Sequence, residues 1–319
     1  MPHPLLLVGA GQLGSRYLQG LVASKSELEI IVVDPSSESL ETAKSRWIEA
    51  GGDESPHQVR WLESLPSDLQ RVDVALIVTS SKGRADLINK IAKAIDVRYW
   101  VLEKVLTQSS EELRAIQYAL TGYEGVWVNT SRRMMSWHQS LKEAFASHGR
   151  LEASYCAGLW GLACNSIHFI DLLAWWSGES LVSVDTSGLD HHWHESKRAG
   201  YFEITGELVA HFSGGTSLRL SSKEDAHAQP IQVVLSDGII WDVDEPTGTA
   251  RSSSGEQFDG RIKFQSQLSG RLVDDILERG ECDLPPLDES SEMHAIFLDA
   301  MLLHWNLSQN RNDDRVPIT

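Results

Sequence analysis

Residues 5–14 have the sequence LLLVGAGQLG, in which a short apolar run ends in three glycines at the spacing GxGxxG. Gly9 permits a tight turn, and Gly11 lets a pyrophosphate approach the backbone with no side chain in the way. Gly14 lets the following helix pack closely on the strand, and the first N–H groups of that helix face the phosphates. This stretch predicts a dinucleotide-binding site.

A second strand, residues 29–34 (EIIVVD), ends in an acid. Asp34 lies about 20 residues beyond the last glycine, where a carboxylate accepts hydrogen bonds from the adenosine ribose hydroxyls. The same carboxylate would repel a 2′-phosphate, and residues 35–38 contain no Arg or Lys to neutralise one. NAD is therefore the predicted cofactor. NADP is the less favoured alternative, because Ser36 and Ser37 offer hydroxyls to a phosphate.

The chain has 319 residues, which is enough for two domains with separate cores. Its formal net charge of -17 argues against general affinity for nucleic acid or for anionic membranes. Three cysteines without CxxC spacing do not indicate a disulfide framework. The apolar run at residues 5–8 is too short for a signal sequence, so we expect a cytoplasmic protein.

Strand and helix patterns alternate over the first part of the chain. The run at residues 72–79 is apolar almost throughout, as in strands buried on both faces of a parallel sheet. The alternation predicts a Rossmann domain with a parallel sheet over residues 1–128. The other expected strands are 58–61, 99–102 and 126–129, and the expected helices are 39–48, 86–95 and one opened by Ser109 and Glu112.

The pattern changes in the second part, residues 129–319, where we expect an α+β domain with a largely antiparallel open sheet. A helix at 167–176 precedes segments that alternate apolar and polar residues, as strands with one covered face do. The expected strands are 181–184, 202–212, 216–220 and 231–234, and two helices end the chain, the last at 289–307. Residues 247–260 are rich in Ser, Gly and Thr and are predicted to form a mobile loop.

Several of these motifs occur together in an order that resembles one family. They are Gly9 to Gly14, Asp34, Glu103-Lys104, Arg132-Arg133, residues 167–173 in a helix, and residues 284–287 before the last helix. The chain resembles the oxidoreductases of the glucose–fructose oxidoreductase and inositol dehydrogenase (Gfo/Idh/MocA) family. The resemblance implies a sugar-like substrate and assembly into homodimers or homotetramers through the C-terminal sheet. The predicted cofactor-binding residues are Gly9, Gly11, Gln12, Leu13, Gly14, Asp34, Thr79 and Glu103.

Glu103-Lys104 matches two residues of the Glu-Lys-Pro element that the family places at the mouth of its cofactor site, whereas Val105 departs from the proline. A Lys just past the carboxyl end of a parallel strand lies at the edge where such sheets bind ligands. Its ammonium can hold a substrate hydroxyl and relay its proton. The alternative is a surface Lys paired with Glu103.

His168 matches the family's helical His, but Cys164 stands four residues before it, where the family has an Asp. We expect His168 to act as the general base and to share proton transfer with Lys104. Asp171, one turn later, either orients the imidazole or is a buried structural acid. A thiol at Cys164 does not replace a carboxylate as a proton acceptor at neutral pH. The predicted substrate-binding residues are Arg133, Cys164, Asn165 and Asp171.

Two further groups have competing interpretations. Arg132 and Arg133 follow a predicted strand and either bind a substrate carboxylate or phosphate, or act in helix capping or interdomain salt bridging. The His-rich run at 190–195 resembles a metal site in composition only, because adjacent histidines in a loop do not converge, so no metal is predicted.

Together these features predict an NAD-dependent oxidoreductase that interconverts CH–OH and C=O on a sugar or sugar derivative. One alternative is a redox-neutral enzyme with tightly bound NAD. Another is a ligand-sensing or regulatory protein of the same fold, which the departure at Cys164 favours.

Overall fold

The computed structural model describes residues 2–319. The chain forms two compact units. Unit 1 comprises residues 1–103, 114–129 and 263–287, and unit 2 comprises residues 104–113, 130–262 and 288–319. Both units therefore use segments that are distant in the sequence. The division at residues 128 and 129 stays a prediction about domains.

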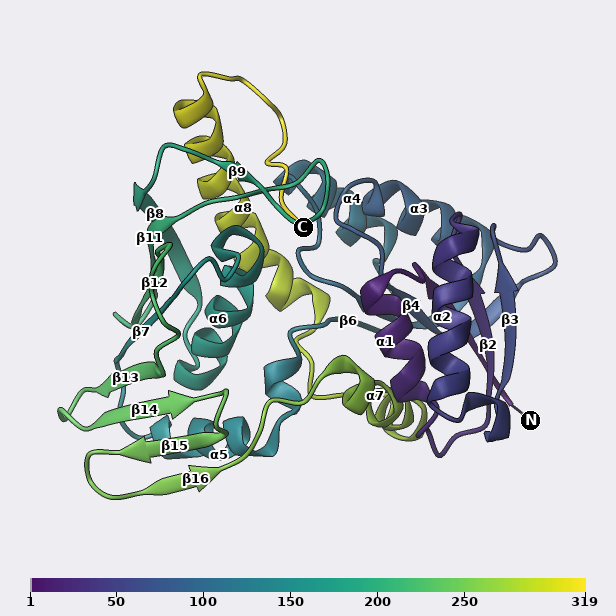
Figure 1. The fold of residues 1–319 in the computed structure, drawn as a ribbon, viewed down its shortest axis with the longest axis horizontal. Coiled ribbons are helices and arrows are strands. Elements are labelled where there is room, and N and C mark those ends of the chain that lie inside the picture. The colour runs from purple at the N-terminus through teal and green to yellow at the C-terminus, as the bar shows by residue number, and fades with distance from the viewer. Residues whose placement is uncertain (1) are drawn as a thin grey trace. The chain divides into compact units, whose positions relative to one another are not determined.

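Unit 1 contains a parallel six-stranded sheet in the order β3-β2-β1-β4-β5-β6 (Figure 1). The order reverses between β1 and β4, as in a doubly wound dinucleotide-binding fold. The strands are β1 (His3–Val8), β2 (Leu28–Val33), β3 (Gln58–Leu62), β4 (Arg71–Ile77), β5 (Asp96–Leu102) and β6 (Gly125–Val128). The helices with residues in unit 1 are α1 (Gln12–Leu21), α2 (Ser37–Glu49), η1 (Gly52–Glu54), α3 (Arg84–Ala94), α4 (Ser110–Ala119) and α7 (Gln265–Arg279).

Helix α7 comes late in the chain but packs on α1 within unit 1 (Figure 1). Two glycines allow the close approach: a Cβ on Gly20 would lie 2.9 Å from the Gln265 carbonyl oxygen, and one on Gly270 would lie 2.7 Å from the Gly20 carbonyl oxygen. Asp274 of α7 accepts hydrogen bonds from the Ser24 hydroxyl at 2.7 Å and from the Lys25 amide, which ties the segment after α1 to α7. A late segment thus completes the dinucleotide-binding unit.

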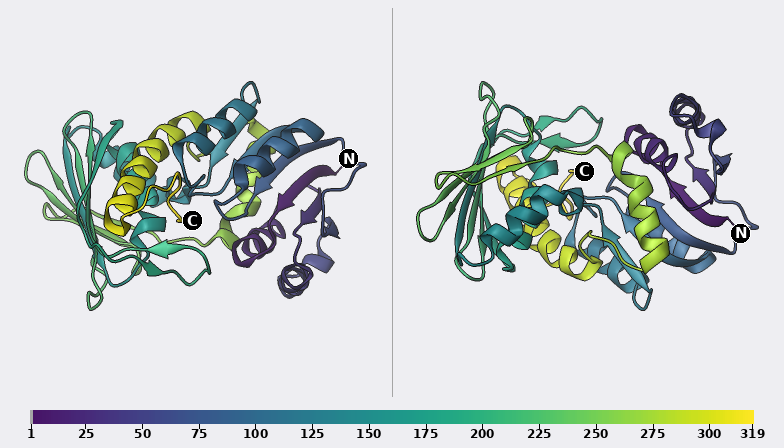
Figure 2. Two further views of the ribbon diagram at one scale, coloured as in Figure 1. Left: turned by 90° about the horizontal axis from the view of Figure 1, so that it is seen from above. Right: turned by 90° about the horizontal axis from the view of Figure 1, so that it is seen from below.

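Unit 2 is built on a mixed, mostly antiparallel eight-stranded sheet in the order β16-β15-β14-β13-β7-β12-β11-β8, with only β7 and β12 parallel among the pairs of this sheet. Helices α6 and α8 lie on one face of this sheet (Figure 2). The strands are β7 (Leu151–Ala157), β8 (Leu181–Leu189), β11 (Gly206–Phe212), β12 (Ser217–Ser222), β13 (Ile231–Leu235), β14 (Ile240–Asp244), β15 (Thr249–Ser252) and β16 (Gln257–Asp259). The remaining elements are η2 (Ser131–Met134), α5 (Ser136–Phe145), α6 (Leu162–Ser177), β9 (His194–Glu195), β10 (Phe202–Glu203) and α8 (Leu287–Gln309). The predicted fold class, a parallel Rossmann domain followed by an α+β part, is confirmed.

The prediction of a mobile loop at residues 247–260 was wrong, because this segment forms the hairpin of β15 and β16. Ala250 is fully buried, and the Phe258 ring stacks on Trp241 of β14 with ring centroids 5.4 Å apart. Gly255, at φ +98°, lies in the turn between the two strands. The Ser and Gly residues thus form a tight turn between paired strands.

The expected single strand at 202–212 is also interrupted. Residues 202 and 203 pair with β9 in a separate two-stranded sheet, and β11 begins at Gly206. Gly206 has φ +103°, and a Cβ there would lie 2.6 Å from the Gly188 carbonyl oxygen. The glycine therefore redirects the chain and places Glu203 outside the large sheet.

Candidate active site

The glycine loop of unit 1 has the geometry that a dinucleotide site needs. Gly9 has φ +101°, and a Cβ there would lie 2.9 Å from the Val78 carbonyl group. A Cβ on Gly14 would lie 1.8 Å from the Gly9 carbonyl oxygen, so only glycine allows α1 to start so close to β1. At Gly11, by contrast, a Cβ would meet nothing within 4 Å. Gly9 and Gly14 are required by the fold, whereas the space at Gly11 is open to a ligand.

The first turn of α1 has no side-chain cap and no acidic residue. Gly11, Gln12 and Leu13 are exposed at this turn. Helix N–H groups without such partners, together with the helix dipole, favour an anion. The loop and the turn therefore fit the pyrophosphate of NAD, and contacts from Gln12 and Leu13 to it stay predictions.

Asp34 directly follows β2 and is half-buried. Its Oδ2 accepts the Ala10 amide at 2.7 Å, and its Oδ1 accepts the Ser36 amide at 2.9 Å. The carboxylate therefore braces the glycine loop, and each oxygen keeps a lone pair for a ribose hydroxyl. The Ser36 hydroxyl is used as the N-cap of α2, where it accepts the Ser39 amide at 3.1 Å.

A buried arginine links the ends of β4 and β5. The guanidinium of Arg84, which is 1% exposed, donates to the backbone carbonyl oxygens of Thr79 and Glu103. The Thr79 hydroxyl is buried without a hydrogen-bond partner among the described residues. Thr79 and Glu103 thus lie at the carboxyl edge of the sheet, where doubly wound folds bind ligands.

The Glu103 side chain is buried in a network inside unit 1. Its Oε1 accepts the Tyr17 hydroxyl at 2.5 Å and the Asn129 amide at 2.6 Å, which connects β5, α1 and the residue after β6. Burial, together with the negative charge of Glu103, raises the pKa of Tyr17 well above its usual value. This network gives Glu103 a structural role, and direct contact with a cofactor stays a prediction.

Lys104 is bound to the first turn of α6 within unit 2. Its Nζ donates to the Cys164 carbonyl oxygen at 3.0 Å and to Asn165 Oδ1 at 3.3 Å. The Asn165 amide in turn donates to the Trp160 carbonyl oxygen at 2.9 Å. The peptide bond between Lys104 and Val105 is cis. Lys104 and Glu103 therefore have different partners among the described residues, and the structure does not pair them as the alternative interpretation required.

His168 lies one turn further along α6 and is half-buried. Burial lowers the pKa of His168 well below its usual value, and the positive charges of Lys104 and Arg132 lower it further. The imidazole is therefore neutral at neutral pH and able to accept a proton. Its Nδ1 has no hydrogen-bond partner among the described residues, so Asp171 does not orient the ring through that atom.

The Asp171 carboxylate is paired with Arg133 instead. Arg133 Nη2 lies 2.7 Å from Asp171 Oδ1 and its Nε lies 3.0 Å from Oδ2, and both residues are buried. The same Nη2 reaches Glu289 Oε1 at 2.6 Å. Burial raises the pKa of Asp171, and Arg133 opposes that rise. Roles for Arg133 and Asp171 in substrate binding stay predictions.

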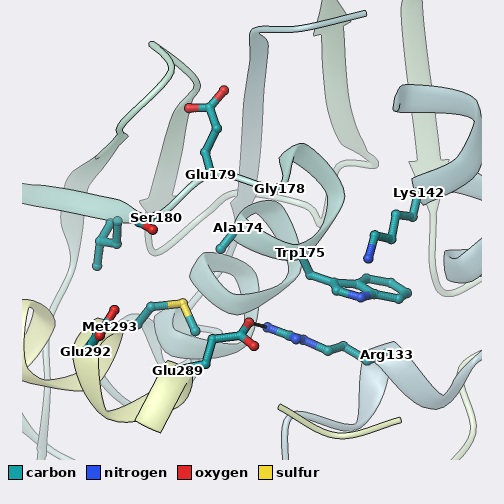
Figure 3. A pocket seen from close by; sticks show the side chains of 11 residues that line it. Arg133, Lys142, Ala174, Trp175, Gly178, Glu179, Ser180, Glu289, Glu292 and Met293 are labelled. Carbon is teal, nitrogen blue, oxygen red and sulfur yellow. Dashed lines mark hydrogen bonds and ion pairs between the residues drawn. The ribbon is translucent and has the colours of Figure 1, made fainter. Parts of the chain in front are cut away.

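Arg133 borders a pocket of about 440 Å³ in unit 2 (Figure 3). Figure 3 shows its guanidinium directed at Glu289 and close to the Trp175 indole, which Lys142 also approaches with Nζ 4.7 Å from the ring centroid. Lys104 and His168 are not among the residues that line this pocket. The structure therefore brings Lys104, Cys164, Asn165 and His168 together, and it places Arg133 at a different cavity.

Arg132 forms a separate, half-buried ion pair with Glu245. Its Nε and Nη2 bind the two carboxylate oxygens at 2.6 and 2.8 Å, and its guanidinium lies 4.6 Å from the centroid of the Phe169 ring. Glu245 Oε1 also lies 3.1 Å from His138 Nε2. Arg132 and His138 hold the pKa of Glu245 well below its usual value. Glu245 was missed by sequence reasoning.

The His-rich run at 190–195 forms no metal centre within residues 2–319, where the structure has no group of three His, Cys, Asp or Glu side chains that could hold a metal ion. Over the same residues no helix has the length and apolar character needed to cross a membrane.

No family model matches the chain, and no curated protein matches its sequence. Solved structures match its fold. UDP-N-acetylglucosamine 3-dehydrogenase from Acidithiobacillus ferrooxidans has a TM-score of 0.71 and 16% identity over 97% of this chain and 100% of that one. Myo-inositol dehydrogenase from Lactobacillus casei, solved with NAD(H) and myo-inositol, has a TM-score of 0.65 and 15% identity over 98% and 96%.

An oxidoreductase from Agrobacterium radiobacter, solved with NAD+, L-tartaric acid and magnesium, has a TM-score of 0.70 and 11% identity over 93% of this chain and 94% of that one. At these identities the likeness establishes the fold. Each match spans nearly the whole chain, so the likeness includes both units.

Proposed function

We propose that this chain is an NAD-dependent oxidoreductase that interconverts CH–OH and C=O on a sugar or sugar derivative. One observation carries the proposal. Lys104, two residues after the end of β5 in the dinucleotide-binding sheet, is hydrogen-bonded to the first turn of the helix that bears a neutral His168. An ammonium bound at the first turn of a helix and a neutral imidazole one turn later are the groups needed to move the proton of a hydroxyl.

The residues of unit 1 fit NAD. The open space at Gly11 and the first turn of α1 suit its pyrophosphate, and Asp34 suits the ribose hydroxyls while it disfavours the 2′-phosphate of NADP. A bound NAD would supply the acceptor or donor of the hydride. The protein's contribution is then to bind the dinucleotide and to handle the proton.

In the oxidative direction, the substrate carbon loses a hydride and its hydroxyl loses a proton. The neutral imidazole of His168 takes that proton, and the Lys104 ammonium donates a hydrogen bond to the same oxygen as it becomes a carbonyl oxygen. Asn165 offers an amide for a neighbouring hydroxyl. In the reverse reaction the protonated imidazole of His168 returns the proton, and the Lys104 ammonium again donates a hydrogen bond to the substrate oxygen.

The test is formation of NADH at 340 nm from NAD+ with a panel of hexoses, inositols, sugar acids and nucleotide sugars. Lys104→Met and His168→Asn should each lower turnover by about 10²- to 10⁴-fold, the usual contribution of a general acid or base, without weakening NADH binding. Turnover of Lys104→Met within about tenfold of wild type would remove Lys104 from the mechanism.

A ligand sensor that binds NAD without turnover is the second candidate, and Cys164 favours it. Burial raises the pKa of this thiol to about 12, so it does not accept protons at neutral pH at the position where the resemblance predicts an acid. Tight binding of NADH together with a sugar, with no hydride transfer to any compound of the panel, would identify the sensor.

We also propose that the chain forms a homodimer or homotetramer through the eight-stranded sheet. Helices α6 and α8 lie on one face of this sheet, as Figure 2 shows, so the other face is the expected interface. Light scattering after gel filtration measures the mass, and a monomer at micromolar concentration would contradict this proposal.

A further inference from the structure

Glu203 places a buried carboxylate at the first turn of α6. The residue is 8% exposed, and its Oε2 accepts the Ala163 amide at 2.8 Å. The N-cap of the helix is Gly161, which has no side chain to cap it, and a Cβ there would lie 3.2 Å from Glu203 Oε1. The cap of α6 therefore comes from β10, about 40 residues later in the chain.

The same helical turn binds Lys104. The two hydrogen-bond acceptors of its ammonium, the Cys164 carbonyl oxygen and Asn165 Oδ1, are both uncharged. The Cys164 thiol contacts the Gly161 carbonyl oxygen at 3.6 Å and the Glu203 carboxylate. Burial raises the pKa of Glu203, and Lys104 is among the groups that oppose the rise, so the two charges interact.

We infer that Glu203 is a positioning residue for the proposed reaction: from β10 it supplies the negative charge that holds the Lys104 ammonium on the first turn of α6. This carboxylate lies beside Cys164, the position at which the resemblance leads us to expect an acid on the helix itself. The inference rests on the proposed function for its catalytic meaning, but its electrostatic content is testable without substrate.

The other charged and titratable groups near Lys104 are His168, Arg132, Glu245 and His294. His168 interacts with Lys104 and also with three groups of unit 2, namely Arg132, Glu245 and His294. Glu245 is neutralised by Arg132. Glu203 is thus the acid of unit 2 whose charge acts on both Lys104 and Cys164.

A simple structural cap is the competing interpretation, because a carboxylate at a helix N-terminus stabilises the helix wherever it lies. Glu203→Gln separates the two. Glutamine keeps an oxygen that can accept the Ala163 amide, and it removes the charge. The matched control is Glu195→Gln, the same change in the exposed acid of the neighbouring strand β9.

The experiment follows the side-chain amine of Lys104 by NMR of protein labelled with ¹³C- and ¹⁵N-lysine, with the signal assigned by its loss in Lys104→Met. In Glu203→Gln the ¹⁵Nζ signal of Lys104 should move at constant pH, because the opposite charge near the ammonium is removed. In Glu195→Gln it should not move. An unchanged Lys104 signal in Glu203→Gln would reduce Glu203 to a helix cap and overturn the inference.

If Glu203→Gln does not fold, the reciprocal measurement replaces it. Coupling between two sites is mutual, so Lys104→Met should raise the pKa of Glu203, measured by NMR of protein with ¹³C-labelled carboxyl groups. No shift would contradict the inference.

In the enzyme assay, Glu203→Gln should move the pH profile of kcat/KM. Glu203→Asp keeps a carboxylate and should therefore give a profile closer to that of the wild type. A change of the Lys104 NMR signal in Glu203→Gln, together with no turnover of any alcohol by the wild-type protein, would uphold the electrostatic role of Glu203 and refute the proposed function.

Discussion

Gly11→Ala is the sharpest test of the dinucleotide site, because the structure separates its effect on binding from its effect on folding. A Cβ at Gly11 meets no atom of the protein within 4 Å, and its φ of -63° suits any residue. The methyl group would occupy the space that we assign to the pyrophosphate. Gly14→Ala is the contrasting variant, since its Cβ would lie 1.8 Å from the Gly9 carbonyl oxygen.

The magnitudes follow from these two environments. For Gly11→Ala, the smaller entropy of the unfolded chain stabilises the protein by about 0.4–1 kcal/mol. Alanine is a poorer N-cap than glycine by roughly 0.5–1 kcal/mol, so the two effects nearly cancel. Binding of NADH should lose about one hydrogen bond to a charged group, about 1.5–3 kcal/mol, which is about 10- to 150-fold in affinity. Gly14→Ala should destabilise the fold by about 1–3 kcal/mol or more.

Urea denaturation measures the free energy of unfolding, and fluorescence titration measures the dissociation constant of NADH. The expected result is that Gly11→Ala unfolds like wild type and binds NADH at least about tenfold more weakly. Gly14→Ala should unfold more easily. If Gly11→Ala binds NADH with wild-type affinity, no dinucleotide crosses the loop at Gly11 and the cofactor assignment fails.

Asp34→Asn keeps an acceptor for only one of the two loop amides and removes the charge. It should raise the ratio of NADP to NAD affinity about tenfold, and competitive titration with an unchanged ratio would show that Asp34 does not select the cofactor. Lys104→Met should raise the pKa of His168 in an NMR titration, since the ammonium lowers it now, and an unmoved imidazole would contradict the shared site. Because that pKa is lowered on folding, His168 should reduce stability as pH falls below about 6.5, and His168→Gln should flatten this loss in urea titrations at several pH values. Arg133→Met leaves Asp171 buried and unpaired and should cost about 3–5 kcal/mol of unfolding free energy, whereas a cost below about 1 kcal/mol would show that the pair is not structural.

Much of the fold was predictable because its strongest signals are local. Apolar runs identify β1, β2 and β4, the first followed by a glycine and the second by an acid, and their alternation with helices indicates a parallel sheet. Local signals failed where the partner is distant. The composition of residues 247–260 is typical of a flexible loop, and only the stacking of Phe258 on Trp241 shows that the segment is ordered. Likewise, no sequence pattern in α7 indicates that it packs on α1.

The same distinction applies to the site. Lys104 follows a recognisable strand, and His168 lies on a recognisable helix, so the sequence predicts both as site residues, and their roles stay predictions. Residues three or four apart share a helix face, so the sequence directs attention to Cys164 and Asp171 as neighbours of His168 on its own helix. The structure pairs Asp171 with Arg133 and leaves Cys164 a thiol whose pKa is raised to about 12.

The acid beside Cys164 comes instead from Glu203, in a two-residue strand that follows a His-rich loop and precedes Gly206. Helical periodicity carries no information about a cap delivered from another strand. Two requirements meet at the first turn of α6. A helix whose N-cap is glycine needs an acceptor for its first amides, and the ammonium bound to that turn needs a negative charge nearby. One carboxylate meets both, so a residue that would otherwise count as structural is also expected to hold the Lys104 ammonium on this turn.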